Sequence, residues 1–160
     1  MSRVNHISVS ATDLAASTAF YARLLGAVPI ATPDFAASVQ WLAVGDTQLH
    51  LFESELEPTS HHHFGVEVDL DALIAAYRMA DELGIFDDET FHHRLIGLPG
   101  DVAQLYLRDP SWNLIELDAV GASRLPDDLR EQLRVLDDAR PQRGEHAEAR
   151  LYIGAQRPGR

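Results

Sequence analysis

Four side chains with metal-binding chemistry recur at matching places along the sequence. His6 and His63 each begin a segment of alternating apolar and polar residues, whereas His50 and Glu116 lie in later segments of the same kind. Imidazole and carboxylate groups without thiolates suit Fe²⁺, Mn²⁺, Ni²⁺ or Zn²⁺. Two histidines and one carboxylate would leave positions on such an ion open for substrate or water. The four residues therefore predict a site for one divalent metal ion.

The elements that must position these residues occur twice, in the same order. The first half predicts a strand over 3–10, a helix over 11–26, and strands over 28–33, 37–44 and 47–54. The second half predicts a strand over 62–68, a helix ending at Gly84, and strands over 89–97, 101–109 and 113–120. A repeat of about 57 residues indicates an α+β fold of two tandem βαβββ modules. Their sheets would curve as one mixed sheet around a metal cleft.

The boundaries of the modules follow from the repeat. Module one covers 1–57, module two covers 61–120, and Pro58–Ser60 link them within a single domain over 1–120. Residues 125–139 predict one amphipathic helix whose apolar stripe contains Leu129, Leu133 and Leu136. The rest of 121–160, rich in Gly, Pro and Arg, predicts a tail that is either loosely ordered or docked on a partner subunit.

Strand alternation places the four candidate ligands on the sheet face that points away from the helices. Other side chains on this face divide into two groups. The candidate catalytic residues are Glu67, as a base, and Tyr106, as a hydrogen-bond donor. The candidate substrate-binding residues are Gln48, Phe52, Gln104 and Arg108.

Three segments of the sequence resemble the vicinal oxygen chelate superfamily, which includes glyoxalase I, extradiol dioxygenases, and fosfomycin and bleomycin resistance proteins. They are VNHISVSATDLAASTAFYARLLG, HFGVEVD and LYLRDPSWNLIEL, and the resemblance covers about residues 3–120. It implies paired βαβββ modules around a metal cleft, with ligands at His6, His63 and Glu116. The remaining ligand position of the family falls on His50, or on Gln48 if the strand register slips by two.

The sequence departs from the family at two places. Trp112 stands where the family usually has glycine, so its ring would either reach the cleft mouth, as a substrate-binding residue, or cover the turn. Tyr106 precedes Glu116 by ten residues, as in extradiol dioxygenases. However, the histidine that this pattern places shortly before the tyrosine is missing, and His92 and His93 lie too far upstream to fill its place without a bulge. Histidines carried on a loop could substitute for it.

The resemblance implies a metal-dependent enzyme that binds neighbouring oxygens of a small substrate, either a glyoxalase-type lyase or isomerase or a ring-cleaving dioxygenase. An alternative is a metal-free protein of the bleomycin-resistance type that sequesters a cationic ligand, which the net charge of -12 would favour. A third is a fosfomycin-type thiol transferase. The predicted face offers only Arg108 for a phosphonate, and this ranks the transferase last.

Composition limits the partners and the compartment. The net charge of -12 argues against nucleic acid, and no stretch approaches the roughly 20 apolar residues of a membrane span. The absence of cysteine excludes disulfides and thiolate ligands. We therefore expect a cytoplasmic protein with a small-molecule substrate, and the family resemblance adds a possible homodimer.

Overall fold

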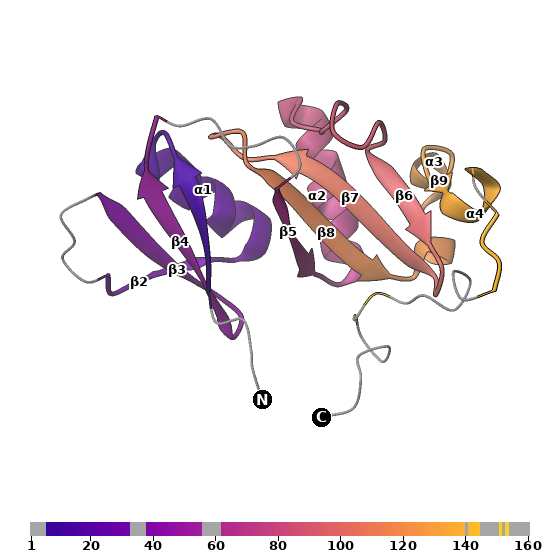
Figure 1. Cartoon of the computed structure of the whole chain (residues 1–160), viewed down its shortest axis with the longest axis horizontal. Helices are drawn as coiled ribbons and strands as arrows, with labels where there is room; N and C mark the ends of the chain where they lie inside the picture. The colour runs from indigo at the N-terminus through magenta and orange to yellow at the C-terminus, as the bar shows by residue number, and fades with distance from the viewer. Residues whose placement is uncertain are drawn as a thin grey trace. The chain divides into compact units, whose positions relative to one another are not determined.

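The computed structural model describes residues 6–32, 38–55, 62–139, 141–144, 151 and 153. The chain divides into two compact units (Figure 1). The first unit takes Met1–Phe64 and Arg108–Leu114, and the second takes Gly65–Leu107 and Ile115–Arg160. None of the helices in the described residues is long and apolar enough to cross a membrane.

The first unit carries one helix and a four-stranded sheet. Its elements are β1 (His6–Ala11), α1 (Leu14–Leu25), β2 (Val28–Ile30), β3 (Val39–Val44) and β4 (Thr47–Glu53). The strand order is β1-β4-β3-β2, in which β1 and β4 run parallel and the other neighbours antiparallel. The side chain of Asp13 accepts a hydrogen bond from the Ala16 N–H at the start of α1, and Gly26 ends the helix with a φ of 63°.

The second unit repeats this order of elements. It contains α2 (Leu70–Leu83), β6 (Leu95–Leu98) and most of β5 (His63–Glu67), β7 (Val102–Arg108) and β8 (Leu114–Val120). Asp69 caps the start of α2, and Gly84, with a φ of 65°, ends it. The prediction of two βαβββ modules is therefore confirmed. The predicted linker Pro58–Ser60 lies outside the described residues.

The strand predicted over 89–97 begins later than its sequence suggests. Residues before Leu95 form a loop in which the Asp87 carboxylate accepts hydrogen bonds from the Thr90 N–H and hydroxyl, at 3.0 and 3.1 Å. His92 adopts a φ of 57°, which an extended strand does not allow. The predicted start of this strand was wrong because side-chain bonds to Asp87 fold the segment into a turn.

The single helix predicted over 125–139 was also wrong. The segment after β8 forms a short 3₁₀ turn, η1 (Ala122–Arg124), then α3 (Asp127–Arg130), β9 (Arg134–Val135) and α4 (Leu136–Ala139). β9 pairs in parallel with β6 and completes a sheet of order β5-β8-β7-β6-β9. The outer edge of β6 has backbone N–H and C=O groups that need partners, and β9 supplies them. The apolar spacing of residues 125–139 does not reveal this edge, because it reports only contacts along the segment.

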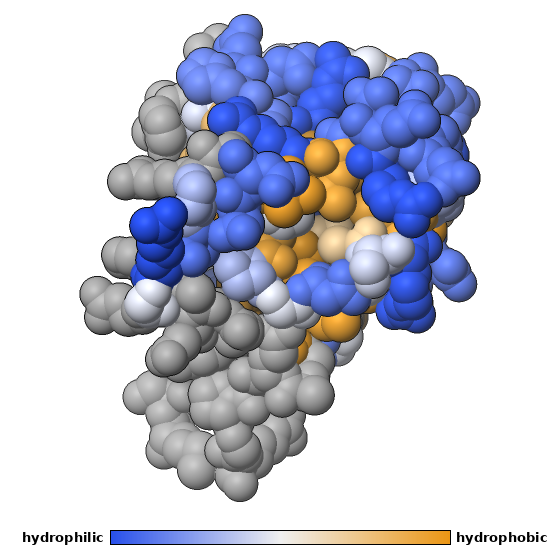
Figure 2. All heavy atoms as spheres, turned by 90° about the vertical axis from the view of Figure 1, so that its right-hand side faces the viewer, coloured by the Kyte–Doolittle hydropathy of each residue, from blue (hydrophilic) through white to orange (hydrophobic). Residues whose placement is uncertain are grey.

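This extension is packed as well as paired. Leu129 is 1% exposed, and a Cβ built on Gly97 would lie 3.4 Å from the Leu133 side chain. The small residue in β6 therefore lets the extension lie close against the sheet. Figure 2 faces the side of Figure 1 on which α3, β9 and α4 lie, and shows apolar side chains gathered there among hydrophilic ones.

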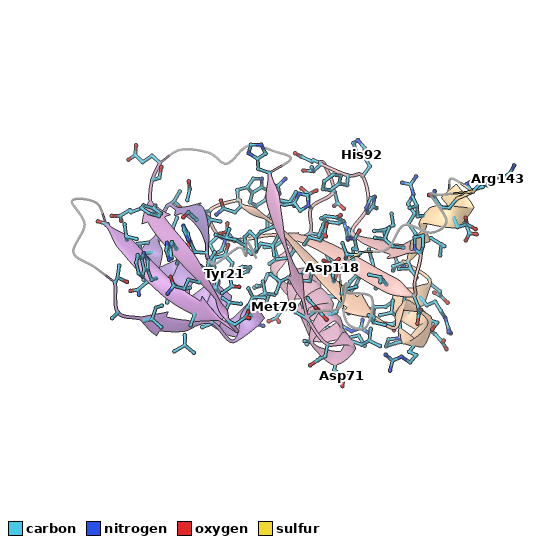
Figure 3. The ribbon with its side chains drawn as sticks, turned by 60° about the horizontal axis from the view of Figure 1, so that its bottom comes forward. Tyr21, Asp71, Met79, His92, Asp118 and Arg143 are labelled. Atoms are coloured by element: carbon cyan, nitrogen blue, oxygen red, sulfur yellow. The ribbon has the colours of Figure 1, made fainter. Side chains whose placement is uncertain are left out.

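Each unit has its own buried apolar side chains between helix and sheet. Tyr21 of α1 and Met79 of α2 belong to these cores (Figure 3). In the first unit the sheet contributes Leu42, Leu49 and Leu51; in the second unit it contributes Leu105, Leu107, Ile115 and Leu117. The side chains between these positions on β4 and β8 belong to the opposite face, where the predicted site residues lie.

Candidate functional site

Two candidate ligands lie side by side in the first unit. Ser8 of β1 is the Cα partner of His50 on β4, so His6 lies two residues before the position opposite His50. The rings of His6 and His50 stack with centroids 4.5 Å apart and planes 15° apart. On β3, Trp41 is the Cα partner of His50, and its ring stacks on His50 at 4.2 Å and 3°.

Gln48 fixes one nitrogen of His50. The Gln48 Oε1 lies 3.0 Å from the His50 Nε2, and an amide oxygen only accepts, so this nitrogen carries the proton. Burial, and after it the charge of His6, lowers the pKa of His50. His50, which is 7% exposed, is therefore held as a neutral imidazole.

The second unit gathers two buried carboxylates around one amide. The Gln104 Nε2 donates to Glu116 Oε1 and to Asp118 Oδ1, both at 2.8 Å. Burial, and after it the charge of Glu116, raises the pKa of Asp118 to about 7. Figure 3 shows Asp118 on β8. Asp118 lies two residues after Glu116 on β8, so strand alternation puts both on one face, but no role was predicted for Asp118.

Gly65 of β5 makes room for this pair. A Cβ on Gly65 would lie 3.2 Å from Asp118 Oδ2 and 3.3 Å from Glu116 Oε1. Glu116 thus lies beside Gly65, two positions after His63. In the same way, His50 lies opposite Ser8, two positions after His6. The structure therefore keeps the repeat relation between His50 and Glu116 that the sequence indicated.

Tyr106 adjoins the carboxylate pair and an aromatic loop. Its hydroxyl donates to Gln104 Oε1 at 3.4 Å. Its ring lies 4.8 Å from that of Phe91 and 5.5 Å from that of His93. Burial, and then a hydrogen bond with Glu116, raises the pKa of Tyr106 well above its usual value. Tyr106 therefore stays protonated and can donate. The loop thus brings His93, which lies too far upstream to match the missing histidine in a regular strand, into contact with Tyr106.

The remaining candidates are spread over exposed positions and a turn. His63 and Glu67 are exposed on β5, as is the neighbouring His62, whereas His61 lies outside the described residues. The charge of Glu67 contributes to the raised pKa of Asp118. Phe52 is 38% exposed.

Arg108 and Trp112 belong to the turn between β7 and β8. Arg108 is buried, and its Nη1 donates to the Trp112 carbonyl oxygen at 2.9 Å. The Trp112 side chain is 57% exposed, at a residue with a φ of 66°. More than half of this residue is therefore accessible to solvent.

The same turn anchors the first unit. The buried Tyr21 hydroxyl donates to Asp109 Oδ2 at 2.8 Å, and Asn113 Nδ2 donates to the Ser10 carbonyl oxygen at 2.6 Å. The Ser111 hydroxyl accepts from the Thr12 N–H at 2.8 Å. The segment from Asp109 to Asn113 therefore has a structural role as a connector of the first unit.

The donor set fits a divalent metal ion in its chemistry. Imidazoles and carboxylates are ligands that suit such an ion, and two buried carboxylates that share one amide donor would gain from a nearby cation. Among the described residues, no three His, Asp or Glu side chains are gathered around one point where an ion could bind. The meeting of His6, His50, His63 and Glu116 at a single ion thus stays a prediction.

The sequence matches the profile of the glyoxalase/bleomycin resistance protein/dioxygenase superfamily over residues 3–117. The protein belongs to this superfamily, which agrees with the resemblance seen in its motifs. No curated protein sequence matches the chain.

Solved structures share the fold. A fosfomycin resistance protein, FosX, from Listeria monocytogenes, solved with Mn(II) and dihydroxypropylphosphonic acid, is 17% identical with a TM-score of 0.59, over 77% of this chain and 95% of that one. A glyoxalase/bleomycin resistance protein/dioxygenase from Alicyclobacillus acidocaldarius is 26% identical, with a TM-score of 0.51 over 74% and 91%. A glyoxalase family protein from Bacillus anthracis is 20% identical, with a TM-score of 0.57 over 75% and 96%.

Proposed function

We propose that the protein is a divalent-metal-dependent enzyme of the glyoxalase/dioxygenase type, with His6, His63 and Glu116 as metal ligands. The observation that carries this proposal is the buried pair of Glu116 and Asp118 around Gln104. Burying two carboxylates side by side costs free energy, and a fold without use for them would gain from apolar residues at these positions. A metal ion bound by Glu116 would offset this cost, because its positive charge would stabilise the two buried carboxylates.

The proposed substrate is a small molecule with two neighbouring oxygens. A divalent ion would supply Lewis-acid stabilisation of negative charge that develops on these oxygens. Gln104 orients the Glu116 carboxylate. The protonated Tyr106, whose hydroxyl lies beside Gln104, is the proposed hydrogen-bond donor to the substrate. Glu67, exposed on β5, is the proposed proton acceptor. Gln48, Phe52 and the exposed ring of Trp112 are proposed to contact the substrate, and a homodimer is the proposed assembly.

Metal binding tests the proposal directly. We expect protein purified without added metal to contain a stoichiometric divalent ion by elemental analysis. Glu116→Gln and His63→Gln should bind Fe²⁺, Mn²⁺, Ni²⁺ or Zn²⁺ more than about 100-fold more weakly in calorimetry, because each removes a ligand. Glu82→Gln and His62→Gln are matched controls at exposed positions and should bind as the wild type does. Wild-type protein that binds none of these ions would refute the proposal.

A second candidate is a metal-free protein that sequesters a cationic ligand, as in bleomycin resistance. The net charge of -12 favours it. Tight binding of a cationic glycopeptide by protein treated with a chelator, together with no affinity for divalent ions, would select this function. The fosfomycin-type transferase stays third, because Arg108, the basic residue considered for a phosphonate, already donates to the Trp112 carbonyl.

A further inference from the structure

Three aromatic rings form a continuous stack across three strands of the first unit. Trp41 on β3 lies against His50 on β4, and His50 lies against His6 on β1. The planes of Trp41 and His50 differ by 3°, and those of His50 and His6 by 15°. His50, the middle residue of the stack, is the Cα partner of Trp41 on one side and of Ser8 on the other. The register of the three strands therefore fixes the position of the stack.

The stack limits what His50 can do at a metal. An ion lies in the plane of each imidazole that binds it, about 2.1 Å from the nitrogen. Two stacked rings whose planes are only 15° apart do not share such a point, because the ion would sit above the face of one of them. As placed, His6 and His50 do not bind the same ion.

The hydrogen bond at Nε2 of His50 adds a second restriction for that nitrogen, whereas Nδ1 is restricted by the stack alone. The Nε2 is held by the Gln48 amide oxygen at 3.0 Å. Turning the ring to present this nitrogen would break that hydrogen bond and the stack on Trp41 together. An aromatic stack contributes about 0.5–1.5 kcal/mol, and a hydrogen bond a similar amount, so the observed orientation is held from two sides.

We propose that His50 is a positioning residue and not a fourth metal ligand: sandwiched between Trp41 and His6, it fixes the imidazole plane of His6. This inference rests on the proposed function and deepens it. The protein ligands are then three, His6, His63 and Glu116. On a six-coordinate ion, three ligands leave room for both oxygens of the substrate and for one further small molecule, whereas a fourth ligand would leave room for the substrate oxygens only.

Two substitutions at His50 give opposite orders of metal affinity under the two roles. His50→Phe keeps a stacking ring and removes both nitrogens, whereas His50→Glu removes the ring and supplies a ligand. We expect His50→Phe to keep the calorimetric Kd for Mn²⁺ or Zn²⁺ within about threefold of the wild type. His50→Glu should weaken it about tenfold or more, as loss of support for a ligand does. The reverse order would overturn the inference and leave the proposed function intact.

Trp41 provides an independent test of the same stack. Trp41→Leu should weaken metal binding about tenfold, and Trp41→Phe should restore most of the loss, since it keeps a ring against His50. Circular dichroism and thermal unfolding show whether each variant is folded. Equal affinity for the leucine and phenylalanine variants would contradict a positioning role for the stack.

A measurement on the wild type does not depend on any variant folding. X-ray absorption of the zinc-loaded protein counts the imidazoles bound to the ion. We expect two, from His6 and His63, and three would show that His50 is a ligand. A wild-type protein that takes up no metal would instead refute the proposed function, so the two failures have different signatures.

Discussion

Trp112 is a single residue at which backbone strain and exposure coincide. Its φ of 66° lies in the left-handed region, which costs a residue other than glycine about 1–2 kcal/mol. Two hydrogen bonds to its own backbone groups hold it there: its N–H donates to the Asp109 carbonyl oxygen, and its carbonyl oxygen accepts from the Arg108 side chain. The side chain, 57% exposed, contributes little to holding this conformation.

Comparison of two small substitutions isolates the strain at Trp112. Trp112→Gly and Trp112→Ala both remove the ring, but only glycine relaxes the left-handed backbone. We expect the glycine variant to exceed the alanine variant by about 1 kcal/mol in free energy of unfolding, measured with urea. An alanine variant as stable as the glycine variant would mean that the turn is not strained at this residue.

Asp109 gives a pH dependence whose sign follows from its surroundings. Burial raises the pKa of Asp109, against hydrogen bonds from Asn113 and Tyr21 that favour the charged form. The pKa of Asp109 in the folded protein therefore lies above the unfolded value of about 3.9, and the stability that its protonated form contributes is fully present below about pH 3.9. It is lost as the pH rises through the folded pKa.

Asp109→Asn removes this titration. We expect the unfolding free energy of the wild type, minus that of the variant, to fall as the pH rises from about 4 toward 7. Urea unfolding of both proteins across this range measures the difference, and the other carboxyl groups cancel because both proteins contain them. A difference that grows with pH would show that the hydrogen bonds to Asp109 outweigh its burial.

At the scale of elements, the extension after β8 behaves as part of the second sheet. β9 pairs with β6, and α3 buries Leu129 fully. Leu129→Ala should therefore lower the free energy of unfolding by about 2–5 kcal/mol, as in a core. Leu133→Ala, at a half-buried residue that contacts Gly97, should cost less. Similar small effects for both in urea unfolding would mean that the extension is detached from the cooperative unit.

At the scale of the whole molecule, the two sequence modules are not the two compact units. The turn over Arg108–Leu114 comes from module two but belongs to the first unit, where Asp109 accepts from Tyr21 and Asn113 donates to Ser10. Module one alone would leave the buried Tyr21 hydroxyl without its carboxylate. An unsatisfied buried polar group costs about 1–3 kcal/mol.

We therefore expect a fragment of residues 1–57 not to fold. Its two-dimensional NMR spectrum should show the narrow amide dispersion of an unfolded chain, whereas the full-length protein should show a dispersed one. A well-dispersed spectrum with a cooperative thermal transition for the fragment would mean that the turn is dispensable to the first unit.

The sequence by itself determined the repeated elements and the faces of their strands. Caps such as Asp13 and stops such as Gly26 are local signals, and alternation within a strand needs no knowledge of its neighbours. His6, His63 and Glu116 were predicted for the same reason, since each follows from its place in a repeat. The motif around Asp109 was visible, but its bonds to Tyr21 and Ser10 were not.

Only the tertiary structure decided which of these residues touch. The stack of Trp41, His50 and His6 depends on the register of three strands, and register is a property of pairing that no single segment contains. The contact of His93 with Tyr106 required a loop folded around Asp87. Part of a predicted helix is instead β9, which pairs with β6. Hydrogen bonds at a sheet edge join residues far apart in sequence, whereas helix periodicity reflects only neighbouring residues.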